Sequence, residues 1–289
     1  MSISASVDPR VMVMYMEASG LVGIDGPRDE LVSLVMSEGQ GLKVASIVGS
    51  SLDSIKSLGE LTNLRDLRLC CLRNPPSNEA MDALCSSLKN LACFSSLRSL
   101  VLMGLVCLDS HFDAWCRSSL FPSHLQRLHL EGCLLPRIQE WITELHNLYS
   151  LKLTAREVLS KADGIGILAG LPSLFHLRLT IVQNPAERIV IPVNDMAFQV
   201  LKHLEFQCPK TLPAFEVGAM PRLQSLDLWL NVVGWKHEVG QWLIPVGIRE
   251  IHIVNTEHDG ADKCKMAAAE SALRSVLDMH HPGVDLTIF

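Results

Sequence analysis

The feature that most constrains the fold of this chain is an apolar pattern, L-x-x-L-x-x-L-x-L, that recurs through most of its 289 residues. One copy reads Leu145, Leu148, Leu151 and Leu153, and in other copies Phe, Ile, Met or Pro fills single positions. A fixed internal period of this kind indicates a chain built from repeated structural units. The third apolar position marks the register of the eight copies: Leu67, Leu100, Leu128, Leu151, Leu177, Leu204, Leu226 and Ile251.

Successive markers lie 22 to 33 residues apart, close to the roughly 20 to 29 residues of a leucine-rich repeat. The last two apolar positions of each copy alternate with polar residues, as in a strand with one buried face. Because one unit cannot bury its apolar edge alone, neighbouring units must stack. The predicted fold class is therefore α/β: a leucine-rich-repeat solenoid with a parallel concave β-sheet and an irregular, helical convex side.

Composition supports an aliphatic stack and argues against several other classes of protein. The chain holds 46 leucines but only 15 Phe, Trp and Tyr residues together. Its longest apolar run, near Leu100 to Leu108, is about half of the roughly 20 residues that a membrane span needs, so we expect no membrane association. Lys and Arg number 25 against 31 Asp and Glu, a balance that does not favour a nucleic-acid partner.

The N-terminus and the cysteines indicate the compartment. Residues 1–10 lack a basic segment that leads into an apolar run, so they do not form a secretory signal. The nine cysteines contain no C-x-x-C pair and no even framework, which indicates reduced thiols. We therefore expect a cytosolic or nuclear protein and take the cytoplasm as its location.

Several segments between the predicted strands have helical spacing of apolar residues. Helices are predicted at 78–91, 136–145 and 261–279 on the convex side. The last of these and an alternating strand at 284–288 are expected to cap the open end of the stack. The long connection that follows Leu179 is expected to add a short strand at 189–192.

Residues 1–49 depart from the repeat. They contain VDPR at 7–10, LVGIDGPRDEL at 21–31 and LKVASIVG at 42–49. This text resembles the linker and the opening of the NB-ARC nucleotide-binding domain of cereal coiled-coil NB-LRR disease-resistance proteins. The irregular repeats from Ser54 onward resemble the C-terminal leucine-rich repeats of the same family, so the resemblance covers nearly the whole chain.

That family carries a phosphate loop, G-x-x-x-x-G-K-[ST], directly after the segment that ends in Gly49. Here the sequence reads SSLDSIKS at 50–57, and Ile55 stands where the loop requires glycine. We therefore expect no cofactor, no nucleotide hydrolysis and no enzymatic activity. The resemblance implies a truncated organisation: 1–49 as linker and remnant of the NB-ARC start, joined to a leucine-rich-repeat domain at 50–289 with about eight repeats and a C-terminal cap.

The junction itself mimics a repeat. Leu42, Ala45 and Ile47 have the spacing of the start and strand of a copy, and Ala45 precedes Leu67 by 22 residues. Our hypothesis is that this segment, unable to build a nucleotide-binding sheet alone, docks as a substitute first repeat beside Leu67 and Leu69.

Polar residues that flank the strand leucines are predicted to form three rows on the concave face. The first row is Asp66, Ser99, Arg127, Ser150, His176, His203, Ser225 and Glu250. The second row is Arg68, Val101, His129, Lys152, Arg178, Glu205, Asp227 and His252. The third row is Cys70, Met103, Glu131, Thr154, Thr180, Gln207, Trp229 and Val254.

Along the second row, the cations Lys152 and Arg178 are followed by the acids Glu205 and Asp227. A surface that changes sign favours a protein partner with the complementary pattern, and Trp229 is the expected anchor. The predicted protein-binding residues are Arg68, Arg127, His129, Lys152, His176, Arg178, His203, Glu205, Asp227 and Trp229. In the alternative interpretation these charges only solvate the sheet, with Arg178 and Glu205 in a lateral pair worth less than about 1 kcal/mol.

Catalytic and metal-binding alternatives have little support in the sequence. His176 and His203 are expected as lateral neighbours, but zinc needs three or four converging ligands that we cannot assemble. No G-x-S-x-G motif of a hydrolase is present.

The resemblance implies a recognition module in plant innate immunity that binds a pathogen effector or an immune-receptor partner. Two alternatives remain open. One is an ADP- or ATP-dependent defence switch, which requires the phosphate loop. The other is a substrate-recruiting subunit of a ubiquitin ligase, which requires an adaptor such as an F-box.

Overall fold

The computed structural model describes residues 44–48, 64–70, 78–94, 97–104, 122–158, 164–183, 185, 188–193, 197–208, 212–230, 244–255, 263–281 and 283–288. The chain divides into two compact units. The first comprises Met1–Pro122 with Glu131–Cys133, and the second comprises Ser123–Leu130 with Leu134–Phe289.

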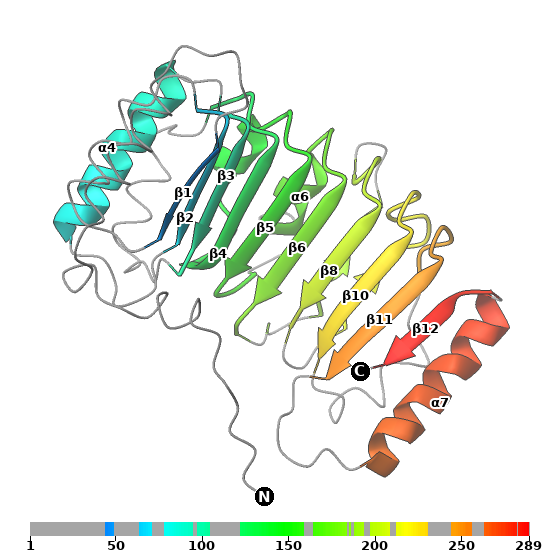
Figure 1. Ribbon diagram of the computed structural model, residues 1–289. Helices are drawn as coiled ribbons and strands as arrows, with labels where there is room; N and C mark the ends of the chain where they lie inside the picture. The colour runs from blue at the N-terminus through cyan, green and yellow to red at the C-terminus, as the bar shows by residue number, and fades with distance from the viewer. Residues whose placement is uncertain are drawn as a thin grey trace, which may run out of the picture. The chain divides into compact units, whose positions relative to one another are not determined.

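Three parallel strands and one long helix form the described part of the first unit (Figure 1). They are β1 (Val44–Val48), β2 (Asp66–Cys70), α4 (Asn78–Phe94) and β3 (Ser99–Met103). Leu67 of β2 lies opposite Ala45 of β1 on one side and opposite Leu100 of β3 on the other. The expectation that the segment around Ala45 pairs beside Leu67 and Leu69 is therefore confirmed. The helix expected at 78–91 is also confirmed and continues to Phe94.

Seven parallel strands, apart from residues 131–133 of β4, form the sheet of the second unit and lie side by side in Figure 1. They are β4 (Arg127–Leu135), β5 (Ser150–Ala155), β6 (His176–Ile181), β8 (His203–Gln207), β10 (Ser225–Leu230), β11 (Glu250–Asn255) and β12 (Asp285–Ile288). A separate short pair joins β7 (Val190–Ile191) to β9 (Ala214–Phe215). The strand expected at 189–192 is thus confirmed, whereas its partner β9 was not predicted.

A ladder of aliphatic side chains holds this sheet together. In register, Leu151 of β5 lies opposite Leu177 of β6, which lies opposite Leu204 of β8. These three side chains are no more than 2% exposed. Burial of a leucine side chain contributes roughly 1.5 to 3 kcal/mol, so each repeat gains stability only through its neighbours. This ladder of parallel strands confirms the predicted fold class.

The backbone immediately before each strand repeats one hydrogen-bonding arrangement. The N–H groups of Phe175 and His176 both donate to the carbonyl of Tyr149, at 2.9 and 3.1 Å. Lys202 and His203 donate in the same way to the carbonyl of Phe175, at 2.9 and 3.2 Å. The same two bonds recur at the starts of β3, β5, β10 and β11, so residues with the same offset in these repeats form straight rows.

Strand β4 interrupts this regularity. His129 lies opposite Lys152, but Leu134, and not Glu131, lies opposite Thr154, so β4 carries three extra residues. Within the extra segment Gly132 has a φ of +81°, a conformation that strongly favours glycine. The prediction that the third row continues from Glu131 to Thr154 is therefore wrong, because counting from the leucines cannot detect a bulge within a strand.

The helical segments agree with the sequence only in part. The helix predicted at 136–145 is wrong in extent: a single 3₁₀ turn, η3 (Glu140–Glu144), is present, because Gln139 has an extended backbone. A short helix that was not predicted, α6 (Gly166–Ala169), lies behind the sheet in Figure 1. The terminal helix α7 (Lys263–His280) and β12 agree with the predicted cap, and β12 pairs with β11.

In the part of the chain that the structure describes, no helix combines the length and the apolar composition of a membrane span.

Candidate functional site

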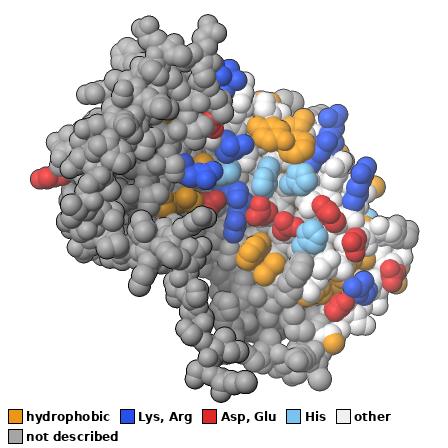
Figure 2. Space-filling model, viewed as in Figure 1, with side chains coloured by type: hydrophobic (Ala, Val, Ile, Leu, Met, Phe, Trp, Pro, Cys, Tyr) orange, Lys and Arg blue, Asp and Glu red, His pale blue; other side chains and the backbone are white. Residues whose placement is uncertain are grey.

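The candidate site lies on one face of the sheet of the second unit. On β6, His176, Arg178 and Thr180 are partly exposed, while the leucines between them are buried. This alternation follows from the period of two along a strand. We call the face formed by the side chains between the buried leucines of β4 to β11 the open face. It is the face that the sequence predicts to be concave, and Figure 2 shows charged, histidine and hydrophobic side chains gathered on the described surface.

The first two predicted rows are present in the second unit. In the first row, neighbouring strands place the following residues side by side: Arg127, Ser150, His176, His203, Ser225 and Glu250. The second row consists of His129, Lys152, Arg178, Glu205, Asp227 and His252. Arg68, the remaining charged candidate, is exposed on β2 of the first unit, opposite Val101.

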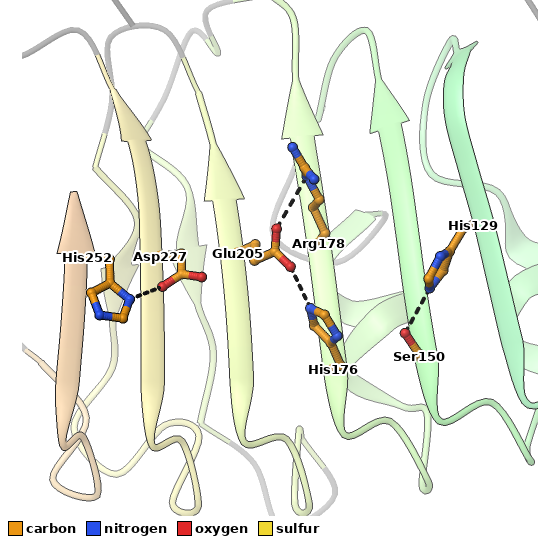
Figure 3. A network of polar contacts seen from close by, with 7 residues as sticks. All are labelled: His129, Ser150, His176, Arg178, Glu205, Asp227 and His252. Carbon is orange, nitrogen blue, oxygen red and sulfur yellow. Dashed lines mark hydrogen bonds and ion pairs between the residues drawn. The ribbon is translucent and has the colours of Figure 1, made fainter. Parts of the chain in front are cut away.

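Glu205 is the centre of the polar network on the open face (Figure 3). Its Oε1 lies 2.7 Å from Nε2 of His176, and its Oε2 lies 3.4 Å from Nε of Arg178. The hydrogen bond from His176 lowers the pKa of Glu205 and outweighs its partial desolvation, with a further lowering by the charge of Arg178. Glu205 is therefore ionised at neutral pH, with its carboxylate already satisfied by two side chains of the neighbouring strand.

Asp227 and His252 form a second lateral pair. Oδ1 of Asp227 lies 2.8 Å from Nδ1 of His252, on adjacent strands β10 and β11. Both side chains are about one-third exposed, at 33% and 35%, so water competes for this contact. Surface pairs of this kind contribute at most about 1 kcal/mol and leave both groups accessible to a partner.

His129 sits at the other end of the second row. Its Nε2 lies 2.9 Å from Oγ of Ser150 (Figure 3). Burial, followed by the positive charges of Lys152 and Arg127, lowers the pKa of His129 from 6.5 to about 4. The imidazole is therefore neutral at physiological pH, and the cations of this corner are lysine and arginine side chains.

The predicted anchor, Trp229, is engaged within the face. The Cζ atom of Arg178 lies 5.3 Å from the centroid of the Trp229 ring, in the range of a cation–π contact. The guanidinium thus contacts both the indole and the Glu205 carboxylate. In the same third row, Thr180 donates a hydrogen bond of 3.3 Å to Oε1 of Gln207.

A cluster of rings that the sequence interpretation missed borders these rows. The rings of Tyr149 and Phe175 stack at 4.8 Å between centroids with an interplanar angle of 12°. The ring centroids of His203 and Phe175 are 5.3 Å apart, and Nζ of Lys202 lies 5.1 Å from the Phe175 centroid. Tyr149, Phe175 and Lys202 each precede a first-row residue, one position before the three predicted rows. Because all three occupy the same position before successive strands, the sequence could have predicted that their side chains lie side by side.

The expected neighbours His176 and His203 do lie together, with ring centroids 6.1 Å apart. However, Nε2 of His176 is directed at Glu205. Among the described residues, no group of three or more His, Cys, Asp and Glu side chains is placed to hold a metal ion.

Comparison with known proteins relates this chain to repeat-containing defence proteins. Residues 34–283 match the family profile described as leucine-rich repeat region. Disease resistance protein RGA5 of rice, Oryza sativa subsp. japonica, is 35% identical over 252 residues, covering 83% of this chain and 22% of the relative. Disease resistance protein PIK6-NP, also of rice, is 29% identical over 204 residues, covering 63% and 19%. The chain therefore spans about a fifth of the length of these relatives.

Proposed function

The chain belongs to the leucine-rich repeat region family, and from this premise we propose that it is the protein-recognition module of a plant disease-resistance protein. The open face is its binding surface, and the partner is a pathogen effector or an immune-receptor protein. This role requires no cofactor and no catalysis. The relationship to the rice disease resistance proteins supports the assignment to plant defence.

The observation that carries the proposal is the order of charges along the second row. Lys152 and Arg178 lie on β5 and β6, and Glu205 and Asp227 lie on β8 and β10. Neighbouring strands are about 4.8 Å apart, so the sign of the surface changes within roughly 15 Å. A partner with the opposite order of charges is attracted and oriented by this pattern, whereas a uniformly charged partner is not.

A cytoplasmic setting accompanies this role. Cys70, Cys85, Cys133 and Cys208 are reduced thiols in the structure. Reduced thiols are typical of the reducing interior of the cell, where an intracellular immune protein meets its partner.

A photo-crosslinker tests the proposal. p-Benzoylphenylalanine is placed at Thr180 on the open face, or at Glu144 on η3 as an exposed control, and the full chain is expressed in rice protoplasts. We expect a light-dependent adduct of discrete mass from position 180 but not from position 144. Asp227→Lys should reduce the yield of that adduct at least about fivefold, because it replaces a negative charge with a positive charge at the acidic end of the second row.

Two results would overturn the proposal. One is a set of adducts that is the same from positions 180 and 144. The other is an adduct from position 180 that is insensitive both to Asp227→Lys and to Lys152→Glu. A thermal unfolding scan of each variant shows whether the chain is folded before the yields are compared.

A further inference from the structure

The ring cluster beside the first row is a preformed surface feature. We call Tyr149, Phe175 and His203, together with the Lys202 ammonium, the aromatic ledge. The N–H of Phe175 donates to the carbonyl of Tyr149 and that of Lys202 to the carbonyl of Phe175, both at 2.9 Å. These backbone bonds fix the spacing of the rings before any partner arrives. A partner that docks here therefore loses little additional conformational freedom from the ledge.

Exposure of the ledge distinguishes it from the buried leucine ladder. The Tyr149 side chain is 49% exposed, although one face of its ring is covered by Phe175. A single exposed aromatic side chain is unremarkable, but a stacked pair with a cation above it presents a larger, rigid apolar area. Tyrosine is among the residues that most often dominate the binding energy of protein interfaces.

The charges around the ledge are positive and available. Arg127 lies beside Ser150 in register, on the β4 side of the rings, and Lys202 lies on the β8 side. Among the described residues, neither of these two cations lies within 4.0 Å of a carboxylate oxygen. The nearby acid Glu205, in contrast, is already paired with His176 and Arg178.

We propose that the aromatic ledge is the anchoring subsite of the open face and takes an acidic segment of the partner protein that carries an apolar side chain between two carboxylates. This inference rests on the proposed function, because it assumes that the open face binds a protein. The apolar side chain covers the Tyr149 ring. One carboxylate pairs with Lys202 and the other with Arg127.

Strand spacing sets the length of the segment. Arg127 is the first residue of β4, and Lys202 directly precedes β8, three steps along the sheet, which is roughly 14 Å at about 4.8 Å per step. An extended chain covers about 3.3 Å per residue, so the two acidic residues are about four positions apart, with about three residues between them. The recognised segment therefore has the form acid, one residue, apolar residue, one residue, acid.

Stacked rings beside a lysine also suit the bases of a single-stranded nucleic acid. The open face favours a protein, because Glu205, Asp227 and Glu250 lie on the neighbouring strands and repel a phosphate backbone. The overall charge of −6 acts in the same direction. Fluorescein-labelled dT20 therefore serves as the competing probe.

A phage-displayed library of random 12-residue peptides, selected on the full chain, tests the inference. We expect enrichment of peptides with an apolar residue flanked by Asp or Glu at the predicted spacing. Fluorescence anisotropy with a selected peptide should then show about a tenfold or greater loss of affinity in Tyr149→Ala and in Lys202→Glu. Tyr149→Phe should keep most of the affinity, since it retains the ring.

Lys89→Glu is the matched control, because it makes the same change of charge at an exposed position on α4 of the other unit. Its affinity should stay within about twofold of the original chain. Circular dichroism of each variant shows that a loss of affinity does not come from unfolding.

The outcomes separate this inference from the proposed function. Selected peptides that respond to Asp227→Lys but not to Tyr149→Ala or Lys202→Glu overturn the ledge as anchor and leave the open face as a protein-binding surface. Selected peptides that respond to no substitution on the open face count against both. Binding of dT20 that is lost in Tyr149→Ala and Lys202→Glu overturns the assignment of an acidic protein segment.

Discussion

Nε2 of His176 lies 2.7 Å from Oε1 of Glu205, across the β6 and β8 pair at the centre of the open face. This contact connects the first row to the second row, since His176 belongs to one and Glu205 to the other. The hydrogen bond is the main cause of the lowered pKa of Glu205, ahead of the opposing effect of desolvation. The carboxylate of Glu205 on β8 therefore links its own repeat to the neighbouring repeat of β6.

Substitution of Glu205 by Gln should lower the free energy of unfolding by about 1 kcal/mol, because His176 and Arg178 lose their common charged partner. Urea denaturation at neutral pH measures the change. Glu144→Gln removes the same charge from an exposed position on η3 and should leave the midpoint nearly unchanged. Equal effects of the two substitutions would show that the network does not stabilise the fold.

The stabilisation by Glu205 should also depend on pH. Its pKa is lowered from 4.5 in the folded chain, so its contribution is complete above about pH 4.5 and is lost as the pH falls through the folded pKa. The difference in unfolding free energy between the original chain and Glu205→Gln should therefore shrink below about pH 4.5. Urea titrations from pH 7 to pH 3 measure this difference, and a constant value across the series would contradict the prediction.

His129 predicts a different pH window. Its folded pKa of about 4 lies below the ordinary 6.5, so between these values the unfolded chain binds a proton that the folded chain excludes. Stability should therefore fall as the pH is lowered from 6.5 to 4. Screening by solvent at this partly exposed site limits the loss to the order of 1 kcal/mol.

The imidazole signal of His129 in an NMR titration gives the folded pKa directly, and His129→Gln should flatten the fall in stability. In the folded chain His129 is surrounded by Lys152, Arg127, His176 and Glu205. A measured pKa near 6.5 would show that burial and the two cations do not act on this ring as the geometry indicates.

The bulge of β4 should be sensitive to a methyl group at Gly132. Alanine there is strained at a φ of +81°, and its Cβ would lie 3.2 Å from the backbone nitrogen of Gly104. Left-handed backbone alone costs roughly 1 to 2 kcal/mol. Gly283→Ala is the matched control, since Gly283 has a φ of +97° but nothing within 4 Å of the added Cβ. Urea denaturation should show a larger loss of unfolding free energy for Gly132→Ala than for Gly283→Ala. Equal losses would show that the contact with the Gly104 backbone does not contribute.

Hydrogen exchange tests the first strand. If β1 is a working repeat, the amides of Val44–Val48 that face β2 should exchange slowly, together with those of Leu67 and Leu69. If the β1 amides exchange at the rate of an unstructured chain while β2 is protected, β1 does not act as a repeat of the solenoid.

Register was readable from the sequence wherever nothing interrupts the repeat. Counting from Leu151 and Leu177 places Lys152 beside Arg178, and the structure agrees. The same counting fails at Glu131, because the bulge lies within a strand and leaves the leucine markers intact. The ends of helices were also poorly determined, as the single turn at Glu140–Glu144 shows, since no cap or long apolar stripe fixes them.

Choice of partner within a row was less predictable. The pair of Arg178 and Glu205 follows from lateral adjacency, but the shorter contact of Glu205 is with His176, one row away. Diagonal neighbours on a sheet are within reach of long side chains, so adjacency in sequence register does not select a single partner. The stack of Tyr149 on Phe175 lies outside the counted rows altogether.

The repeated strands, their parallel pairing and the two sides of the sheet could be predicted from the residue pattern alone. This prediction was possible because a buried aliphatic position recurs at a fixed offset and because alternation along a strand is a local property. The polar groups that meet, the position of the bulge in β4 and the rings that stack before the strands became known only from the folded chain. Those contacts depend on side-chain reach and backbone detail between repeats, and no periodic pattern of residues encodes them.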